Sequence, residues 1–353
     1  MAPGHHGNDN PSVPAVGLLR SPDPIVIAHR GASGWIPEQT LEAFDKAIEH
    51  GADAIEFDVV PTRDGVLLAR HENELSATTN VANLGAFASR QATREIDGAP
   101  ITGWFAEDFD TAEIRALRAR QRYDFRDHAL DDQFPVPTLN DVLEWLLRRR
   151  HSLRREIGLF IEIKHPTYFA GVGFDVARTL DRTLAQYNLA DSGSGVVLMS
   201  FETKVLRDLR SRTELPLVQL LDAPQSRPFD WEGSGISRTY GDMVKSGGLA
   251  EIAQYADGIG PWKRLIVPAQ DSNSDGPAAR GLHLAEPTSL ISDAHEMGLF
   301  VCSWTFRDEP RFLAANYDGK PRREYEQFFR LGIDAVITDF PDTALAAKEG
   351  RSP

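Results

Sequence analysis

Cysteine is nearly absent from this chain: Cys302 is the only one in 353 residues. A single thiol excludes an internal disulfide and excludes a zinc site built from several thiolates. Cys302 lies in the strand-like run 299–303, where a free cysteine usually serves as a small apolar side chain in the core. We therefore expect it to be buried and structural.

Positive charge is scarce, and long apolar runs are missing. Lysine and arginine total 38 against 52 aspartates and glutamates, a formal charge of −14, which opposes binding to nucleic acid or to an anionic membrane. An anionic substrate must then be attracted locally, and we expect the partner to be a small molecule. The sequence contains no run of about 18 apolar residues, the length that a membrane-spanning helix needs.

The amino terminus lacks an apolar secretory core within its first 22 residues. Residues 1–23 are rich in Gly, Pro, Asn and Ser, a composition typical of a disordered tail. We expect a cytoplasmic protein, and export would require a translation start other than Met1. The sequence carries no signal for an oligomeric state.

Eight short apolar, β-branched runs alternate with segments that have helical periodicity. The predicted strands cover residues 25–28, 54–59, 159–163, 196–199, 217–221, 257–259, 299–303 and 334–338. Predicted helices include residues 41–50, 139–150, 172–187, 203–211 and 325–331, where apolar residues recur three and four positions apart. This alternation predicts an α/β fold with a parallel sheet. Eight units, with no dinucleotide-binding fingerprint after the first strand, favour a closed (β/α)8 TIM barrel over an open sheet.

The predicted barrel covers residues 24–347, followed by a short tail at 348–353. Residues 63–65 read as a tight hairpin turn, because Asp64-Gly65 separates two extended runs. Residues 73–137 are much longer than one strand-to-helix connection and carry Gly, Asp, Pro and aromatics, which indicates an insertion after the second strand. Residues 224–248 and 271–279 form further loops.

Three carboxylates occupy positions where buried strands usually carry Val or Leu. Glu56 and Asp58 are two residues apart in the second strand and so share one face, and Glu162 ends the third strand. Carboxylates that face one another repel unless a cation lies between them. Three hard oxygen ligands suit Ca²⁺ or Mg²⁺ better than zinc, and the two ions are not distinguished by ligand identity.

Cations and histidines accompany these carboxylates at the carboxyl ends of the strands, where parallel barrels place their active sites. Arg30 can bind two phosphate oxygens and Lys164 adds a compact charge, while His29 and His71 can transfer protons near neutral pH. Taken singly, Glu56 or His71 would be better explained as a salt bridge or a polar core residue. Burying all of them for structure alone would cost desolvation without evident gain.

The order of short motifs closely resembles that of the glycerophosphodiester phosphodiesterase family, from about residue 24 to residue 347. The motifs are His29-Arg30-Gly31, Glu38-x-Thr40, Ala43-Phe44, Gly51-Ala52-Asp53-x-Ile55-Glu56-x-Asp58-Val59, Thr62-x-Asp64-Gly65, His71 with Leu75 and Thr78-Thr79, Glu162-Ile163-Lys164 and Thr338-Asp339-Phe340-Pro341. The resemblance implies a barrel with an insertion after the second strand. Within the family, the chain looks most like the bacterial enzymes that act on deacylated phospholipid headgroups.

By position, the resemblance implies roles that agree with those argued above. Glu56, Asp58 and Glu162 would bind the metal, His29 and His71 would form an acid/base pair, and Arg30 and Lys164 would contact phosphate. The family usually has aspartate after the second histidine, whereas Glu72 stands here, so that position receives no role.

For other residues near the predicted site, both a functional and a structural interpretation remain open. Phe201 and Trp304 would form an apolar wall for the glycerol carbons, or else belong to the rim of the core. Glu38 would orient Arg30, or else cap the first helix. Asp339 would support the site, or else cap the last helix.

The expected reaction is metal-dependent hydrolysis of a glycerophosphodiester to sn-glycerol 3-phosphate and an alcohol, with glycerophosphocholine as the first substrate to try. His29 is assigned as base and His71 as acid, and the nucleophile is water or the neighbouring glycerol hydroxyl. One alternative is a related phosphodiesterase of this fold that acts on a lysophospholipid or on a glycerol-phosphate polymer such as teichoic acid. Another is a non-catalytic barrel that binds phosphodiesters.

Overall fold

The computed structural model describes residues 23–270 and 281–350. The predicted tail at 1–23, apart from Asp23, and the predicted loop at 271–279 lie outside these residues. At the other end, the last helix, α12 (Pro341–Glu349), continues two residues into the segment predicted as a tail. Its buried Ala344 and Ala347 pack against the core and carry the helix past that boundary.

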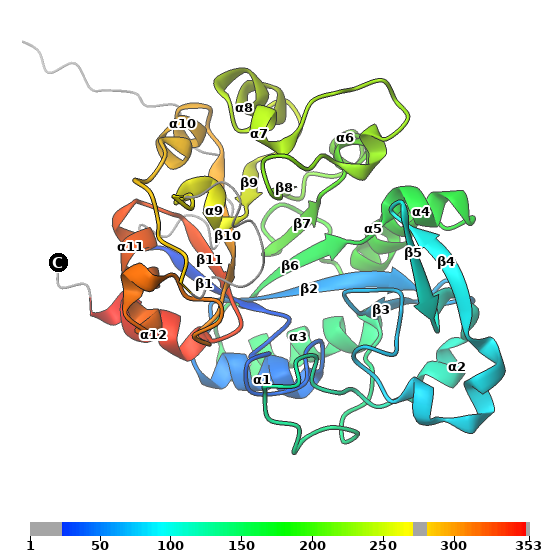
Figure 1. The fold of residues 1–353 in the computed structure, drawn as a ribbon. Coiled ribbons are helices and arrows are strands. Elements are labelled where there is room, and N and C mark those ends of the chain that lie inside the picture. The colour runs from blue at the N-terminus through cyan, green and yellow to red at the C-terminus, as the bar shows by residue number, and fades with distance from the viewer. Residues whose placement is uncertain (1–22, 271–280, 351–353) are drawn as a thin grey trace, which may run out of the picture.

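Eight parallel strands form a closed barrel, which confirms the predicted (β/α)8 fold (Figure 1). Each strand pairs with the next along the chain, and the last pairs with the first. In order, the strands are β1 (Ile25–His29), β2 (Ala54–Pro61), β6 (Gly158–Ile163), β7 (Val196–Ser200), β8 (Leu217–Leu221), β9 (Gly258–Pro261), β10 (Phe300–Phe306) and β11 (Ala335–Thr338). All eight overlap the predicted runs, although β10 continues three residues beyond its predicted end.

Helices cover the outside of the barrel (Figure 1). The longer ones are α1 (Leu41–Glu49), α3 (Leu139–Leu153), α5 (Val176–Gln186), α6 (Thr203–Arg210), α8 (Ser246–Ile252), α10 (Leu290–Glu296), α11 (Pro321–Arg330) and α12. Helix α1 begins where the Thr40 hydroxyl accepts a hydrogen bond from the amide of Ala43, and it ends before Gly51, whose φ is +98°.

The helix predicted over residues 172–187 is wrong at its start. The structure has a short helix α4 (Pro166–Gly171), a break, and then α5. Gly173 takes a φ of +96° in the break, and the Asp175 carboxylate accepts a hydrogen bond from the amide of Arg178 to start α5. The apolar residues keep their helical spacing across this break, and this spacing therefore predicted one continuous helix.

The barrel interior is apolar at the amino ends of the strands and polar at their carboxyl ends. Its buried cluster includes Ile25, Ile27, Ala54, Phe160, Val197, Met199, Phe300, Cys302, Ala335 and Ile337. Continuing the same two-residue step along the strands reaches His29, Glu56, Asp58, Glu162, Lys164, Phe201, Trp304 and Asp339. The pleat of the strands therefore brings the predicted site residues to one end of the barrel. Cys302 is fully buried, as predicted.

The long connection between β2 and α3 contains its own small elements. Strand β3 (Leu67–Ala69) returns antiparallel to β2 through the predicted turn, where Gly65 has a φ of +78°. A two-stranded hairpin, β4 (Ala92–Ile96) and β5 (Ala99–Gly103), follows, then the short helix α2 (Thr111–Ile114) and a loop that leads into α3. Among the described residues, no helix is long and apolar enough to cross a membrane.

Candidate active site

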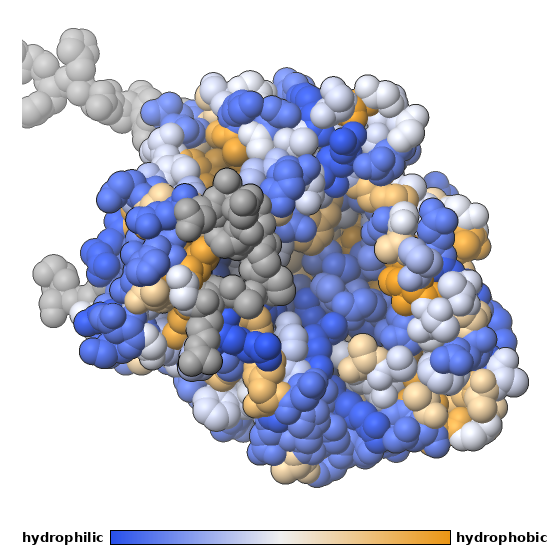
Figure 2. Space-filling model, in the orientation of Figure 1, coloured by the Kyte–Doolittle hydropathy of each residue, from blue (hydrophilic) through white to orange (hydrophobic). Residues whose placement is uncertain are grey.

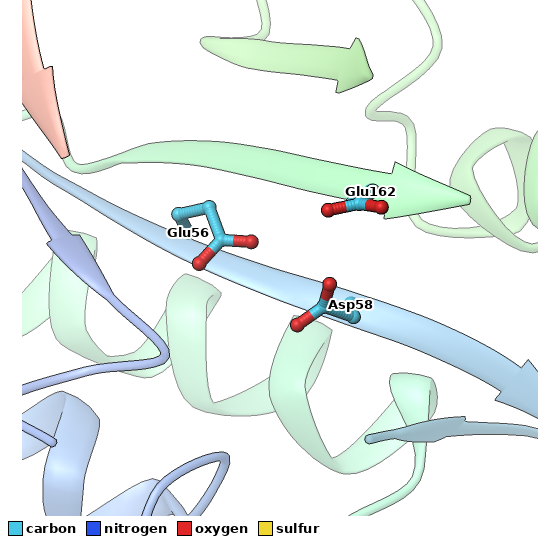
Figure 3. Close-up of side chains that lie close together, drawn as sticks. All are labelled: Glu56, Asp58 and Glu162. Atoms are coloured by element: carbon cyan, nitrogen blue, oxygen red, sulfur yellow. The ribbon is translucent and has the colours of Figure 1, made fainter. Parts of the chain in front are cut away.

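Three carboxylates converge at the carboxyl end of the barrel (Figure 3). Glu56 and Asp58 extend from β2 and Glu162 from β6, and one carboxylate oxygen of each lies within 4.8 Å of the others. The strand register explains the convergence, because Asp58 and Glu162 are direct partners across the pair β2–β6. All three are buried, and Asp58 is fully inaccessible to solvent.

Burial and mutual repulsion disfavour the ionised form of the carboxylates in this cluster. Burial and the neighbouring Asp58 raise the pKa of Glu56 well above its ordinary value. Burial also raises the pKa of Glu162 to about 8, although Lys164 acts in the opposite direction. Burial opposes ionisation of Asp58 as well, but His71, Arg30 and Lys164 outweigh it and keep the pKa of Asp58 low. A divalent cation among these oxygens would favour the ionised form of all three.

The two histidines beside the cluster have the same arrangement of contacts. The Nδ1 atom of His29 lies 2.6 Å from Oδ1 of Asp339, and its Nε2 lies 3.9 Å from Oε2 of Glu56. The Nδ1 atom of His71 contacts Glu72, and its Nε2 lies 3.2 Å from the Lys164 ammonium, which donates to it. In both rings a carboxylate holds Nδ1 and the other nitrogen faces the site.

Both imidazoles are neutral near pH 7. Burial, and then the charge of Arg30, lowers the pKa of His29 to about 4 and the pKa of His71 to about 3. A neutral imidazole whose Nδ1–H is held by a carboxylate carries its lone pair on Nε2, and in His71 that lone pair accepts from the Lys164 ammonium. Each ring can therefore accept a proton at the atom that faces the cluster.

Arg30 and Lys164 supply positive charge beside the carboxylates. The Arg30 side chain donates to Glu38 at 3.0 Å, and its Nε lies 3.5 Å from Asp58. The Lys164 ammonium lies 2.8 Å from Glu162 and 3.8 Å from Asp58. Both cations can also reach an anion bound at the cluster.

The backbone at Arg30 explains the adjacent glycine. Arg30 has a φ of +59° and Gly31 a φ of +85°, both in the left-handed region. A Cβ atom at position 31 would lie 2.6 Å from the carbonyl carbon of Ala43 in α1. Only glycine fits this close approach, so the turn that presents Arg30 depends on it.

A pocket of about 240 Å³ opens over the cluster and is lined by both kinds of side chain that the sequence predicted. His29, Arg30, Glu56, His71 and Glu162 line its polar side. Phe201 and Trp304 line its apolar side, with their rings edge to face at 5.4 Å. The surface is hollowed between the ends of the strands and the β4–β5 hairpin, and hydrophilic residues line much of the hollow (Figure 2).

Several supporting residues were left open or missed at the sequence level. Asp339 contacts His29, and Glu38 contacts Arg30, so each touches a predicted site residue. Gln39 was missed: its amide donates to Asp58 at 2.5 Å and its oxygen accepts from the Asp58 amide. Its position inside the Glu38-x-Thr40 motif was the available sequence signal, and the structure gives it a φ of +61°. Glu72, given no role, contacts His71.

Comparisons with known proteins agree with the resemblance. Residues 29–343 match the model of the glycerophosphoryl diester phosphodiesterase family. The chain is 32% identical to glycerophosphodiester phosphodiesterase GDPD6 of Arabidopsis thaliana over 95% of its length and 88% of that protein. It is 27% identical to the glycerophosphodiester phosphodiesterase of Haemophilus influenzae over 93% and 90% of the two chains. A solved phosphodiesterase of Oleispira antarctica, in complex with the product sn-glycerol-3-phosphate, shares the fold at a TM-score of 0.60 and 19% identity, covering 94% and 99%.

Proposed function

The chain belongs to the glycerophosphoryl diester phosphodiesterase family, and we propose that it hydrolyses glycerophosphodiesters to sn-glycerol 3-phosphate and an alcohol, with a divalent metal ion and acid/base catalysis by His29 and His71. One observation carries the proposal. Three buried carboxylates and two carboxylate-held imidazoles converge on one pocket at the carboxyl end of the barrel.

The residues present fit a divalent cation. Asp58 Oδ1 is buried without a hydrogen-bond partner, although it lies within reach of Glu56 and Glu162. We assign these three side chains as ligands of Ca²⁺ or Mg²⁺, since both ions take carboxylate oxygens. When bound, such an ion withdraws charge from a phosphoryl oxygen and lowers the pKa of a coordinated hydroxyl.

Arg30 and Lys164 would bind the phosphodiester anion. Both cations are held by carboxylates of the site, which keeps them beside the cluster. The planar guanidinium can donate to two phosphate oxygens, and the ammonium can donate to a third.

His29 is proposed as the base. Its neutral Nε2 takes a proton from the nucleophile, either water or the neighbouring glycerol hydroxyl, as the new P–O bond forms. Asp339 at Nδ1 stabilises the resulting imidazolium and holds the ring in place.

His71 is proposed as the acid. It donates a proton to the alcohol oxygen as the old P–O bond breaks. An anion bound beside it favours the protonated ring, and Glu72 at Nδ1 stabilises that cation. Phe201 and Trp304 would contact the glycerol carbons from the apolar side of the pocket.

The direct test is to incubate the protein with glycerophosphocholine and assay sn-glycerol 3-phosphate with Ca²⁺, with Mg²⁺ and with excess chelator. We expect product with one or both ions and none in chelator. His29→Ala and His71→Ala should each lose most turnover. Product formation that is unchanged in chelator would remove the metal from the reaction.

A lysophospholipid is a second candidate substrate, and the apolar lining of the pocket favours it. Trp262, Leu282 and Phe312 line the pocket together with Phe201 and Trp304, which is more apolar surface than a glycerol requires. Comparing kcat/KM for glycerophosphocholine and for lysophosphatidylcholines of increasing chain length tests this. A value that rises with acyl length supports a lysophospholipid, and a value that falls on adding any acyl chain excludes it.

A further inference from the structure

Two arginines of one loop contact the carboxylates that hold the two proposed catalytic histidines. The loop covers residues 118–135 of the long connection, and its ends meet where Arg118 pairs with Pro135 as an isolated bridge. We call it the arginine loop. It is docked on the barrel mouth, because the Gln121 amide donates to the carbonyl of Ser33 at 3.1 Å.

Arg122 joins the two carboxylates that hold His71 and Arg30. Its Nε and Nη2 each donate to Glu38 at 2.7 Å, and its Nη1 and Nη2 donate to Glu72 at 3.1 and 2.6 Å. Glu72 in turn contacts Nδ1 of His71, and Glu38 accepts from Arg30. All three nitrogens of this guanidinium are therefore bonded to carboxylates.

Arg126 does the same for the other histidine. Its Nη2 donates to Asp339 at 2.6 Å, and Asp339 contacts Nδ1 of His29. Its Nε donates to Glu309 at 2.6 Å and its Nη1 to the carbonyl of Ser33 at 3.0 Å. The side chain is 3% exposed, so these contacts are shielded from water.

We propose that Arg122 and Arg126 are positioning residues, through which the arginine loop fixes the orientation of both catalytic histidines by way of Glu72 and Asp339. The inference rests on the acid/base roles proposed above. Neither arginine lines the pocket, so neither is assigned a contact with substrate. Carboxylates that support a reacting or ligating imidazole matter to its orientation, and a loss of about 10- to 100-fold is typical when such outer contacts are removed.

Removing Arg122 should lower kcat more than removing Arg126. Asp339 has a second cation, because Arg307 Nε donates to it at 2.8 Å. Among the described residues, Glu72 forms ion pairs only with His71 and Arg122. Removing Arg122 frees Glu72, whereas removing Arg126 leaves Asp339 with one arginine.

The test compares Arg122→Gln and Arg126→Gln with wild type on glycerophosphocholine with metal. We expect kcat to fall about 10- to 100-fold for Arg122→Gln and about 3- to 10-fold for Arg126→Gln, each with KM within about threefold. Arg120→Gln is the matched control, because Arg120 pairs with Asp132 of the same loop at 2.7 and 2.6 Å. This variant should leave kcat unchanged.

A cycle with Glu72→Gln separates positioning from general stability. Because Arg122 acts through Glu72, Arg122→Gln should lower kcat much less in the Glu72→Gln background than in wild type. An unchanged kcat in folded Arg122→Gln, or an equal loss in both backgrounds, overturns the inference.

If Arg122→Gln does not fold, the kcat of Arg122→Lys tests the inference in its place. This variant keeps a positive charge between Glu38 and Glu72 but cannot bond both with one planar group, so kcat must still fall at least about fivefold. Wild-type kcat in Arg122→Lys overturns the inference. Failure of the proposed function is seen separately, as no wild-type turnover or as full turnover in His29→Ala and His71→Ala.

Discussion

Replacing Glu162 by glutamine should stabilise the metal-free protein while weakening its stabilisation by metal. Burial raises the pKa of Glu162 from 4.5 to about 8, so at pH 7 the unfolded chain carries an ionised carboxylate and the folded chain a protonated one. Folding must therefore take up a proton. The unfavourable free energy is absent below pH 4.5, grows as the pH rises toward 8, and reaches at most about 3 kcal/mol at pH 7. Glutamine has no such ionisation and can still accept from Lys164.

Metal reverses the order of stability. A ligand that binds only the folded state at 1,000 times its Kd adds about 4.1 kcal/mol, and wild type should gain this with Ca²⁺ or Mg²⁺, which exceeds its unfavourable free energy of about 3 kcal/mol at pH 7. Glu162→Gln has lost one of the three carboxylates and should gain much less. Urea and thermal unfolding of both proteins, in chelator and in excess metal, at pH 5, 6, 7 and 8, would measure both effects.

Glu202→Gln provides the matched control. Glu202 is also a buried glutamate, and burial raises its pKa to about 7, but it is not one of the three clustered carboxylates and it accepts from Thr167. Its glutamine variant should keep the full metal response. If Glu162→Gln is less stable than wild type in chelator at pH 8, or if both proteins gain equally from metal, the electrostatic reasoning about the cluster is wrong.

Three further outcomes can be checked with the same activity and unfolding assays. His71→Ala should lower kcat on glycerophosphocholine by about 10²- to 10⁴-fold, the usual contribution of a general acid or base; full turnover would exclude an essential role. Asp339→Asn should lower kcat by roughly 10²-fold with a small change in KM, because the imidazolium of His29 loses its charged partner; a change confined to KM would contradict this. Gly31→Ala should lower Tm steeply or prevent folding, because its Cβ would collide with the Ala43 backbone; a wild-type Tm would contradict the close approach.

The strands and the carboxylate cluster could be predicted because both depend on a period of two. Buried parallel strands appear as continuous apolar runs, and a charged residue in such a run stands out. Glu56, Asp58 and Glu162 each interrupt an apolar run in this way, and the register of β2 against β6 then brings them together. The prediction needed only the pleat and the order of the strands.

The supporting contacts could not be predicted because no periodicity relates their members. Arg122 and Arg126 lie in an irregular loop, and their partners Glu38, Glu72 and Asp339 are up to 213 residues away along the chain. Their sequence neighbours give no sign that they are buried. Only the packing of the arginine loop on the barrel mouth reveals it.

The charges of the site form two groups with different balances. In the outer group, the carboxylates of Glu38, Glu72, Glu309 and Asp339 contact the guanidinium groups of Arg122, Arg126 and Arg307, so each of these charges lies against one of opposite sign. Such a group can hold its geometry without a ligand, because every buried charge has a partner.

The inner group is not balanced in this way. Its three carboxylates, Glu56, Asp58 and Glu162, face two cations, Arg30 and Lys164, so full ionisation leaves one negative charge in excess. A divalent cation would change that excess to one positive charge, and a phosphodiester monoanion would then neutralise it. Binding of metal would therefore prepare the site electrostatically for a singly charged diester, and a doubly charged phosphate monoester would leave a negative charge in a buried pocket. On this argument the protein should bind diesters more tightly than monoesters of the same alcohol when metal is present, and competition between glycerophosphocholine and phosphocholine would measure the difference.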